Sequence, residues 1–330
     1  MNRAITLRLL SLAISLFFLA LLGPADASVI TFGSGSNQFD MTFVEIGNPA
    51  NANDTTGKPN PAGSVAYKYQ IGKYEVREEM IDKFNSSQSL NIYSKDTRGA
   101  NKPATSVSWN HAARFVNWLN TSQGHQAAYN FTTDGVDDNI ALWTSEEAWQ
   151  LGGENLFRHK DAHYFLPSMG EWYKAAYYDP STGNYFNYPT LDGSLPSQVT
   201  SGTTPHTAVY DHTWEQGPAD VTQAGGLNAH GIMGMAGNVW EWEETTINLT
   251  NNDVSSDRGA RGGAWFEFAE NLPSSIRFPD FPDGPNNIIG FRVASVVSAD
   301  EQNAIPEPGS LMVWSLLGLA GFHVSRRLKK

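Results

Sequence analysis

The segment GIMGMAGNVWEW, residues Gly231 to Trp242, decides the fold of this chain. Gly237 permits a backbone conformation that other residues disfavour, which predicts a turn at that point. Trp240 and Trp242 then alternate with Val239 and Glu241. In a strand this alternation places both rings on one face and the Glu241 carboxylate on the other. We therefore expect a strand that is entered from a glycine turn.

Helix signals cluster in the first half of the chain, and short aromatic segments between turns fill the second. Val29–Phe43 and Tyr67–Val76 have the patterns of strands, the latter half-buried, and 180–236 is expected to hold ordered turns with short strands. Four helix starts are predicted: the spacing of Val76, Met80, Ile81 and Phe84, the N-cap Ser108, and the capping boxes Thr144–Glu147 and Ser168–Glu171. This order predicts an α+β domain with one core.

The composition excludes several classes of function. The 330 residues include no cysteine, so disulfides, thiolate nucleophiles and cysteine metal sites are absent. The formal net charge is −12, which argues against a nucleic-acid partner, because phosphate binding needs a basic surface. No phosphate-binding loop, nucleophile elbow or zinc-protease motif occurs.

The first 27 residues have the pattern of a signal peptide, cleaved by signal peptidase. Arg3 and Arg8 precede an uncharged apolar run, and Ala25 and Ala27 flank a small-residue cleavage site. The alternative is an uncleaved anchor, but the run is shorter than the ~20 residues of a spanning helix. The main domain is then expected over 28–300.

Residues 301–330 contain an extended motif, an apolar run and a basic end, in that order. The three parts are Pro306, Glu307 and Pro308; Leu311 to Val324; and Arg326, Arg327, Lys329 and Lys330. An apolar run before a basic cluster is typical of a helix that stops in the membrane, so an ordinary anchor is the alternative. The tail resembles the PEP-CTERM sorting signal, which implies processing by an exosortase and a place in the cell envelope, surface or exopolysaccharide matrix of a Gram-negative bacterium. Loss of 1–27 and 309–330 takes the net charge to −17.

Six segments in order resemble the formylglycine-generating enzyme, or sulfatase-modifying factor, superfamily. They are YQIGKYEV (69–76), PATSVSWNHAARFVNWL (103–119), FLPSMGEWYKAA (165–176), GIMGMAGNVWEW (231–242), RGGAW (261–265) and GFRVA (290–294). The resemblance implies a C-type-lectin-like α+β fold with little regular secondary structure.

The resemblance also implies a calcium site at Gly237, Val239 and Glu241. Backbone carbonyls and a carboxylate are the hard oxygen ligands that calcium prefers. The family has an Asp or Asn ligand at the position of Gly234, so one ligand is missing here. The alternative is that Glu241 is a buried acid paired with an arginine. The resemblance implies a second calcium site in the family, and Asp211 is the one candidate ligand of that site in this chain.

The cysteine pair of the copper-dependent oxidases falls near Glu267 and Leu272 in this chain. Soft thiolates stabilise Cu(I), whereas Glu is a hard ligand and Leu is no ligand. We therefore expect no copper and no formylglycine formation. Two other candidate metal sites are weaker: His159 with His163, interpreted as solvated loop residues, and the acidic loop Asp134–Asn139.

Three arginines need acidic partners in this acidic chain: Arg261, Arg277 and Arg292. Buried ion pairs with Glu241, Glu171 or Asp280 are one interpretation. The other is a ligand groove in which Trp265 and Phe266 stack on sugars while Arg277 donates to acidic groups.

The leading hypothesis is an exported, exosortase-sorted protein whose domain binds a ligand or a structural partner without catalysis. An extracellular polysaccharide or another surface protein would be the partner, and the membrane is contacted transiently through the tail. The alternative is a metal-dependent enzyme of the same superfamily that does not rely on cysteine.

Overall fold

The computed structural model describes residues 27–89, 91–92, 94–132 and 140–297. The predicted cleavage residue Ala25, the loop Asp134–Asn139 and the sorting residues Pro306–Pro308, Arg326 and Arg327 lie outside these ranges. Within them, no helix has the length and apolar character needed to cross a membrane.

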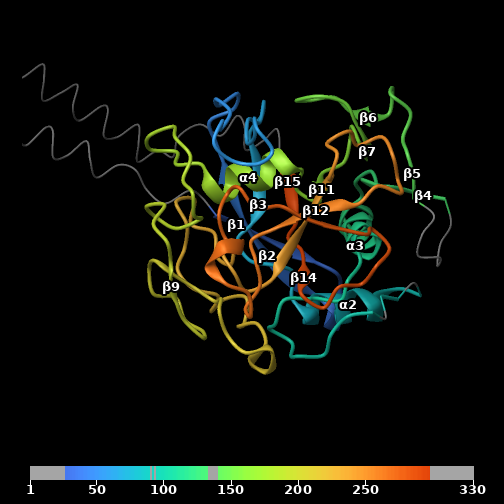
Figure 1. The fold of residues 1–330 in the computed structure, drawn as a ribbon. Helices are drawn as coiled ribbons and strands as arrows, with labels where there is room; N and C mark the ends of the chain where they lie inside the picture. Colours follow the sequence, from blue (N-terminus) through green and yellow to red (C-terminus); the bar gives the residue numbers. More distant parts are fainter. Residues whose placement is uncertain (1–26, 90, 93, 133–139, 298–330) are drawn as a thin grey trace, which may run out of the picture. The chain divides into compact units, whose positions relative to one another are not determined.

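Segments from both ends of the described chain meet in a five-stranded antiparallel sheet. Its strand order is β1 (Ala27–Phe32), β2 (Phe39–Ile46), β3 (Tyr69–Gly72), β15 (Ala294–Val296) and β8 (Tyr164–Phe165). Strands β1, β2, β3 and β15 lie near the middle of the view in Figure 1. The prediction of a half-buried strand near Tyr69 was wrong in one respect, because all four residues of β3 are buried. β3 lies between β2 and β15, so both of its edges are paired, and its residues on both faces are buried.

A four-stranded sheet carries the segment that opened the sequence. Its order is β13 (Phe278–Asp280), β12 (Arg258–Arg261), β11 (Trp240–Thr246) and β14 (Ile289–Gly290). β11 pairs antiparallel with β12 and parallel with β14, with Glu241 opposite both Arg261 and Gly290. The expected strand is confirmed, and it is buried along its whole length.

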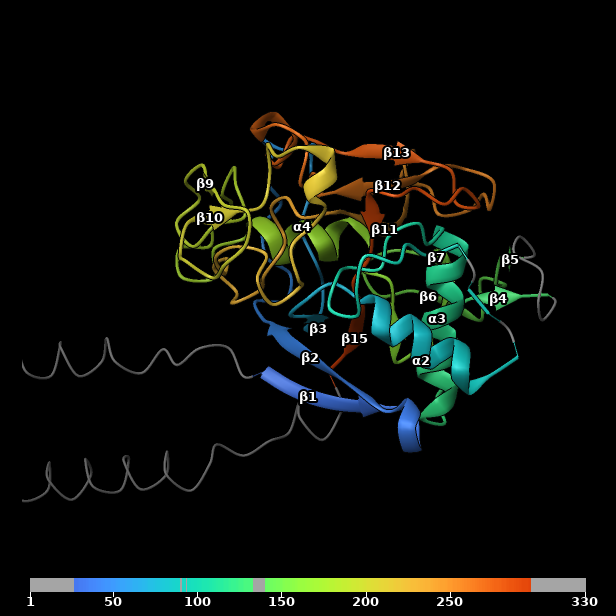
Figure 2. The same cartoon turned by 90° about the horizontal axis from the view of Figure 1, so that it is seen from below.

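Three helices pack among these sheets: α2 (Glu78–Ser87), α3 (Trp109–Ser122) and α4 (Met169–Tyr177). The predicted cap of α3 is confirmed, because Ser108 Oγ accepts from the His111 amide at 3.2 Å. The capping box of α4 is confirmed in both directions between Ser168 and Glu171. In Figure 2, α4 lies between the two sheets while α2 and α3 lie side by side.

The remaining elements are short, and one predicted helix is missing. They are β4 (Asn130–Phe131), β5 (Ile140–Ala141), β6 (Ala148–Trp149), β7 (Asn155–His159), β9 (Ser197–Gln198), β10 (Thr207–Ala208) and three single-turn 3₁₀ helices, η1 (Gly35–Asn37), η2 (Trp214–Gln216) and η3 (Ala269–Asn271). The Thr144 amide and hydroxyl both donate to the Glu147 carboxylate, but the Glu147 amide donates to the Thr144 carbonyl and not to its hydroxyl, so the pair closes a turn before β6. Trp149 then packs on Tyr67 and Phe165, and this tertiary contact overrides the local signal.

Three glutamates of β11 are fully buried, and each meets an arginine from another segment. Glu244 Oε2 lies 2.7 Å from Arg158 Nη2, and the same nitrogen lies 2.8 Å from Glu171 Oε2. Arg158 therefore joins β7, β11 and the first turn of α4.

Replacement of Arg158 by methionine should destabilise the protein by about 3–5 kcal/mol, because two buried carboxylates lose their shared cation. Urea denaturation followed by tryptophan fluorescence measures this change. Lys68→Ala breaks the exposed pair with Glu45 and is the matched control, expected to change stability by less than about 1 kcal/mol. Equal effects of the two substitutions would contradict a central role for Arg158.

Candidate functional site

Glu241 occupies the centre of the predicted calcium position, and an arginine holds it. Arg292 Nε donates to Glu241 Oε2 at 2.5 Å, and Arg292 Nη2 donates to Oε1. Trp172 Nε1 adds a bond to Oε2 at 2.7 Å. All three side chains are fully buried. The alternative interpretation of Glu241, a buried acid paired with arginine, is the arrangement that these contacts form.

Gly237 and Val239 precede Glu241 in the glycine turn that leads into β11, as the sequence predicted. Gly237 has φ +70°, and a Cβ there would lie 2.2 Å from the Val209 carbonyl oxygen, so only glycine fits. A dication at Glu241 would lie next to the Arg292 guanidinium, whose charge opposes it. This donor set fits calcium poorly at Glu241, and calcium binding stays a prediction.

Glu75 completes the same buried cluster. Its Oε1 accepts from Asn238 Nδ2 at 2.7 Å, while its Oε2 has no hydrogen-bond partner within the described residues. A Cβ on Gly234 would lie 2.5 Å from Glu75 Oε1, so the carboxyl fills the room that the glycine leaves. Burial raises the pKa of Glu75 to about 7, with Arg292 opposing and Glu241 adding to the rise.

The segment after Arg261–Trp265 contains Glu267 and Leu272, the two residues that the resemblance aligns near the family's cysteines. Glu267 is half-buried, and its Oε2 accepts from the Ala264 amide at 3.1 Å. Leu272 is fully buried in a small apolar cluster with Ala208, Tyr210 and Ala236. One position therefore holds a carboxyl that folds back on its own turn, and the other is part of the packing.

Aromatic rings gather at the start of this segment. Trp265 is fully buried, and its ring centroid lies 5.4 Å from that of Phe266. Trp214, which is 44% exposed, lies 5.2 Å from Trp265 and 5.0 Å from Phe266. We call Trp214, Trp265 and Phe266 the ring cluster. The Arg98 guanidinium lies 4.8 Å from the Trp265 ring.

Arg277 is not the cation of this cluster. Its Nε lies 2.6 Å from Glu243 Oε2, and its Nη atoms donate to the carbonyls of 245–247. Arg261 pairs with the other oxygen of Glu243 at 2.6 Å. The structure therefore brings Trp265 and Phe266 together as expected, with Arg98 rather than Arg277 over the tryptophan.

Of the two weaker candidates, the acidic loop Asp134–Asn139 lies outside the described residues. Within the described ranges, no group of three or more His, Asp or Glu is placed to hold an ion. His159 ends β7 and is buried, contrary to the expected solvated loop. His163 stacks on His125 at 4.5 Å. Asp211 is exposed, and its amide donates to the Glu267 carbonyl at 2.7 Å.

Sequence reasoning missed Glu75, Arg98, Arg158 and Trp214. Only Glu75 carried a local signal, because it lies just after β3 within the quoted segment 69–76. The other three acquire their roles from residues more than 50 positions away or from loops.

The raised pKa of Glu75 makes a prediction about pH. Because the folded protein holds this proton up to about pH 7 while an ordinary carboxyl releases it near 4.5, stability should fall as pH rises between these values. Glu75→Gln mimics the protonated acid and should remove this part of the decline. The stability of the variant relative to the natural protein should therefore increase as the pH rises from about 4.5 to about 7. Urea midpoints at a series of pH values measure it.

The exposed Glu146→Gln substitution is the control and should leave the pH profile unchanged. Parallel profiles for the natural protein and Glu75→Gln would show that Glu75 keeps its ordinary acidity.

Comparisons with known proteins agree with this architecture. Hercynine oxygenase of Mycolicibacterium thermoresistibile is 29% identical over 160 residues, covering 43% of this chain and 34% of that protein. The inactive C-alpha-formylglycine-generating enzyme 2 of Mus musculus is 32% identical over 73 residues, covering 21% and 23%. The chain thus aligns with about a third or less of each relative's length.

A solved structure, Treponema denticola variable protein 1, shares the fold at TM-score 0.58 and 20% identity, covering 82% of this chain and 99% of that one. Residues 32–297 match the family described as the sulfatase-modifying factor enzyme 1-like domain, or FGE-sulfatase. The match covers most of the chain and agrees with the six segments, the mixed α+β architecture and the low content of regular secondary structure. The chain therefore belongs to the FGE-sulfatase family, as a member without cysteine.

Proposed function

We propose that this chain is an exported surface or matrix protein whose FGE-like domain binds a ligand or structural partner without catalysing the family's oxidation. The observation that carries the proposal is the absence of cysteine from the chain, with Glu267 and Leu272 near the positions that the resemblance aligns with the thiolates of the copper-dependent oxidases. The chain contains no cysteine at any other position that could replace these thiolates. The hard carboxylate and the buried alkyl group do not stabilise Cu(I).

The retained scaffold supports a binding role. Glu241 and Arg292 form a buried, hydrogen-bonded pair, and Gly237 and Trp240 of the same segment are also buried. The mouse relative carries the name of an inactive formylglycine-generating enzyme, which supports the use of this domain without that chemistry. A C-type-lectin-like character of the fold is part of the proposal and agrees with a binding function, although fold alone does not assign one.

The ring cluster supports an extracellular polysaccharide as the ligand. Exposed tryptophan beside a second aromatic ring offers an apolar, rigid surface for a sugar face. Export and sorting rest on the sequence patterns of residues 1–27 and 301–330.

The purified protein should produce no formylglycine when it is incubated with copper and a cysteine-containing sulfatase peptide. Mass spectrometry of the peptide is the measurement, and a copper-dependent family member is the positive control. Aldehyde formation would contradict the proposal. A redox metal bound at one ion per chain would favour the metal-dependent enzyme instead.

Deletion of Ile305 to Lys330 should release the protein into the medium or mislocalise it, because the proposed sorting signal is lost. Fractionation of cells and medium with an antibody measures the distribution. Alanine at Pro306, Glu307 and Pro308 should have the same effect, whereas alanine at Gln302 and Asn303 is the matched control. Unchanged fractionation after the deletion would reject the sorting proposal.

A further inference from the structure

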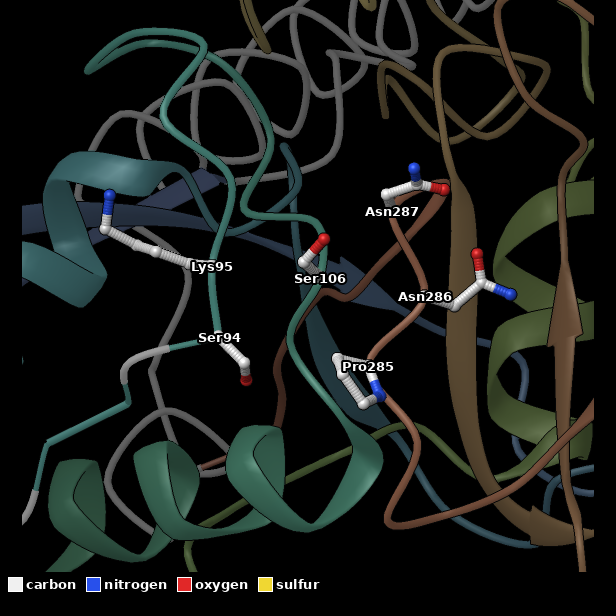
Figure 3. A pocket seen from close by; sticks show the side chains of 6 residues that line it. All are labelled: Ser94, Lys95, Ser106, Pro285, Asn286 and Asn287. Carbon is white, nitrogen blue, oxygen red and sulfur yellow. The ribbon is translucent and has the colours of Figure 1, made fainter.

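A pocket of about 550 Å³ lies between the loop 94–106 and the loop 285–287 (Figure 3). Its volume falls within the roughly 300–1,000 Å³ of small-molecule sites. Unlike most such sites it is lined mainly by polar side chains: Ser94, Lys95, Ser106, Asn286 and Asn287, with Pro285. A polar lining selects a ligand that is itself rich in hydrogen-bonding groups.

Neighbouring side chains hold most of this lining in place. Ser94 Oγ lies 3.1 Å from His111 Nδ1, and Ser106 Oγ donates to Asp96 Oδ2 at 3.1 Å. Asn286 Nδ2 donates to Asp280 at 2.6 Å. The Asn287 side-chain amide is exposed and makes no hydrogen bond to the described residues, so its donor and acceptor both remain available to a ligand.

The charges around the pocket disfavour an anionic ligand. Lys95 Nζ lies 3.1 Å from Asp82 and 3.8 Å from Glu78. In Figure 3 the lysine side chain extends away from the other labelled residues. Arg98 lies 2.9 Å from Asp96. Both cations near the pocket are therefore already paired, and the net charge of the whole chain is negative.

Arg98 connects the pocket to the ring cluster. Its Nη2 donates to the Asn287 carbonyl at 3.0 Å, and its guanidinium lies over the Trp265 ring. A Cβ on Gly217, just after η2, would touch the Arg98 side chain at 3.7 Å. Arg98 thus contacts Asn287 of the pocket and Trp265 of the ring cluster, and it lies beside the residue that follows η2, the turn that carries Trp214.

We propose that the pocket and the ring cluster together bind a neutral segment of polysaccharide. Hydroxyl and amide groups of the pocket exchange hydrogen bonds with sugar hydroxyls, while Trp214 and Phe266 stack on the next sugar ring. This inference rests on the proposed binding function and names the ligand class and the site. A neutral ligand takes the place of the acidic one that the sequence analysis considered for Arg277, because Arg277 is paired with Glu243.

Native gels that contain dextran, galactomannan or alginate test the proposal with the purified full chain. A neutral polymer should retard the protein, and the acidic polymer alginate should not. Asn287→Ala should weaken binding roughly 2- to 10-fold, as expected for the loss of one or two hydrogen bonds. Trp214→Ala should weaken it at least about tenfold. Asn252→Ala and Leu151→Ala, exposed residues outside the site, are the matched controls.

Asn287→Ala removes only an exposed amide, so the result does not depend on how Trp214→Ala folds. Retardation by alginate alone would overturn the neutral ligand class, and neutral retardation that neither substitution weakens would overturn the site. Lack of retardation in every gel would overturn the polysaccharide itself. None of these results changes the formylglycine or fractionation outcomes, which test the proposed function separately.

Discussion

The buried ion pairs of β11 are the constraint on which the rest of the structure depends. This strand carries Glu241, Glu243 and Glu244 through the core with no exposed surface. A buried carboxylate without a partner is strongly destabilising, so each must meet a cation. The partners come from other segments: Arg292 before β15, Arg261 in β12 with Arg277, and Arg158 in β7. These pairs join the two sheets and α4 into one core.

The residues that stabilise the core through these ion pairs are different from Glu267 and Leu272. Glutamates, arginines and tryptophans hold the core, and neither Glu267 nor Leu272, the residues that the resemblance aligns near the family's cysteines, takes part in these ion pairs. Leu272 even contributes to packing, since it lies in an apolar cluster with Tyr210. The ring cluster, which we propose as a binding surface, lies outside these ion pairs.

Sequence signals predicted helix starts correctly where the stabilising contacts join residues that are close together in the sequence. Ser108 and Ser168 cap α3 and α4 as expected, because a side chain that bonds an amide three residues away needs no other segment. Thr144 and Glu147 make only one half of a capping box, because the Glu147 amide donates to the Thr144 carbonyl and not to its hydroxyl. The chain continues into a strand there, where Trp149 packs on Tyr67. The half-buried pattern near Tyr69 failed for a related reason, since β3 is covered on both faces.

The amino-acid sequence alone was enough for the family, for the absence of thiolate chemistry and for the turn at Gly237, because these follow from residue identity and short spacing. It left open whether Glu241 meets a metal or an arginine. Only the tertiary structure settled the contacts of this carboxylate, since Arg292 lies 51 positions away, and Arg158 lies 86 positions from Glu244. The pocket beside Arg98 likewise exists only because loops 94–106 and 285–287 meet. Such contacts depend on how distant segments pack, and no local pattern encodes them.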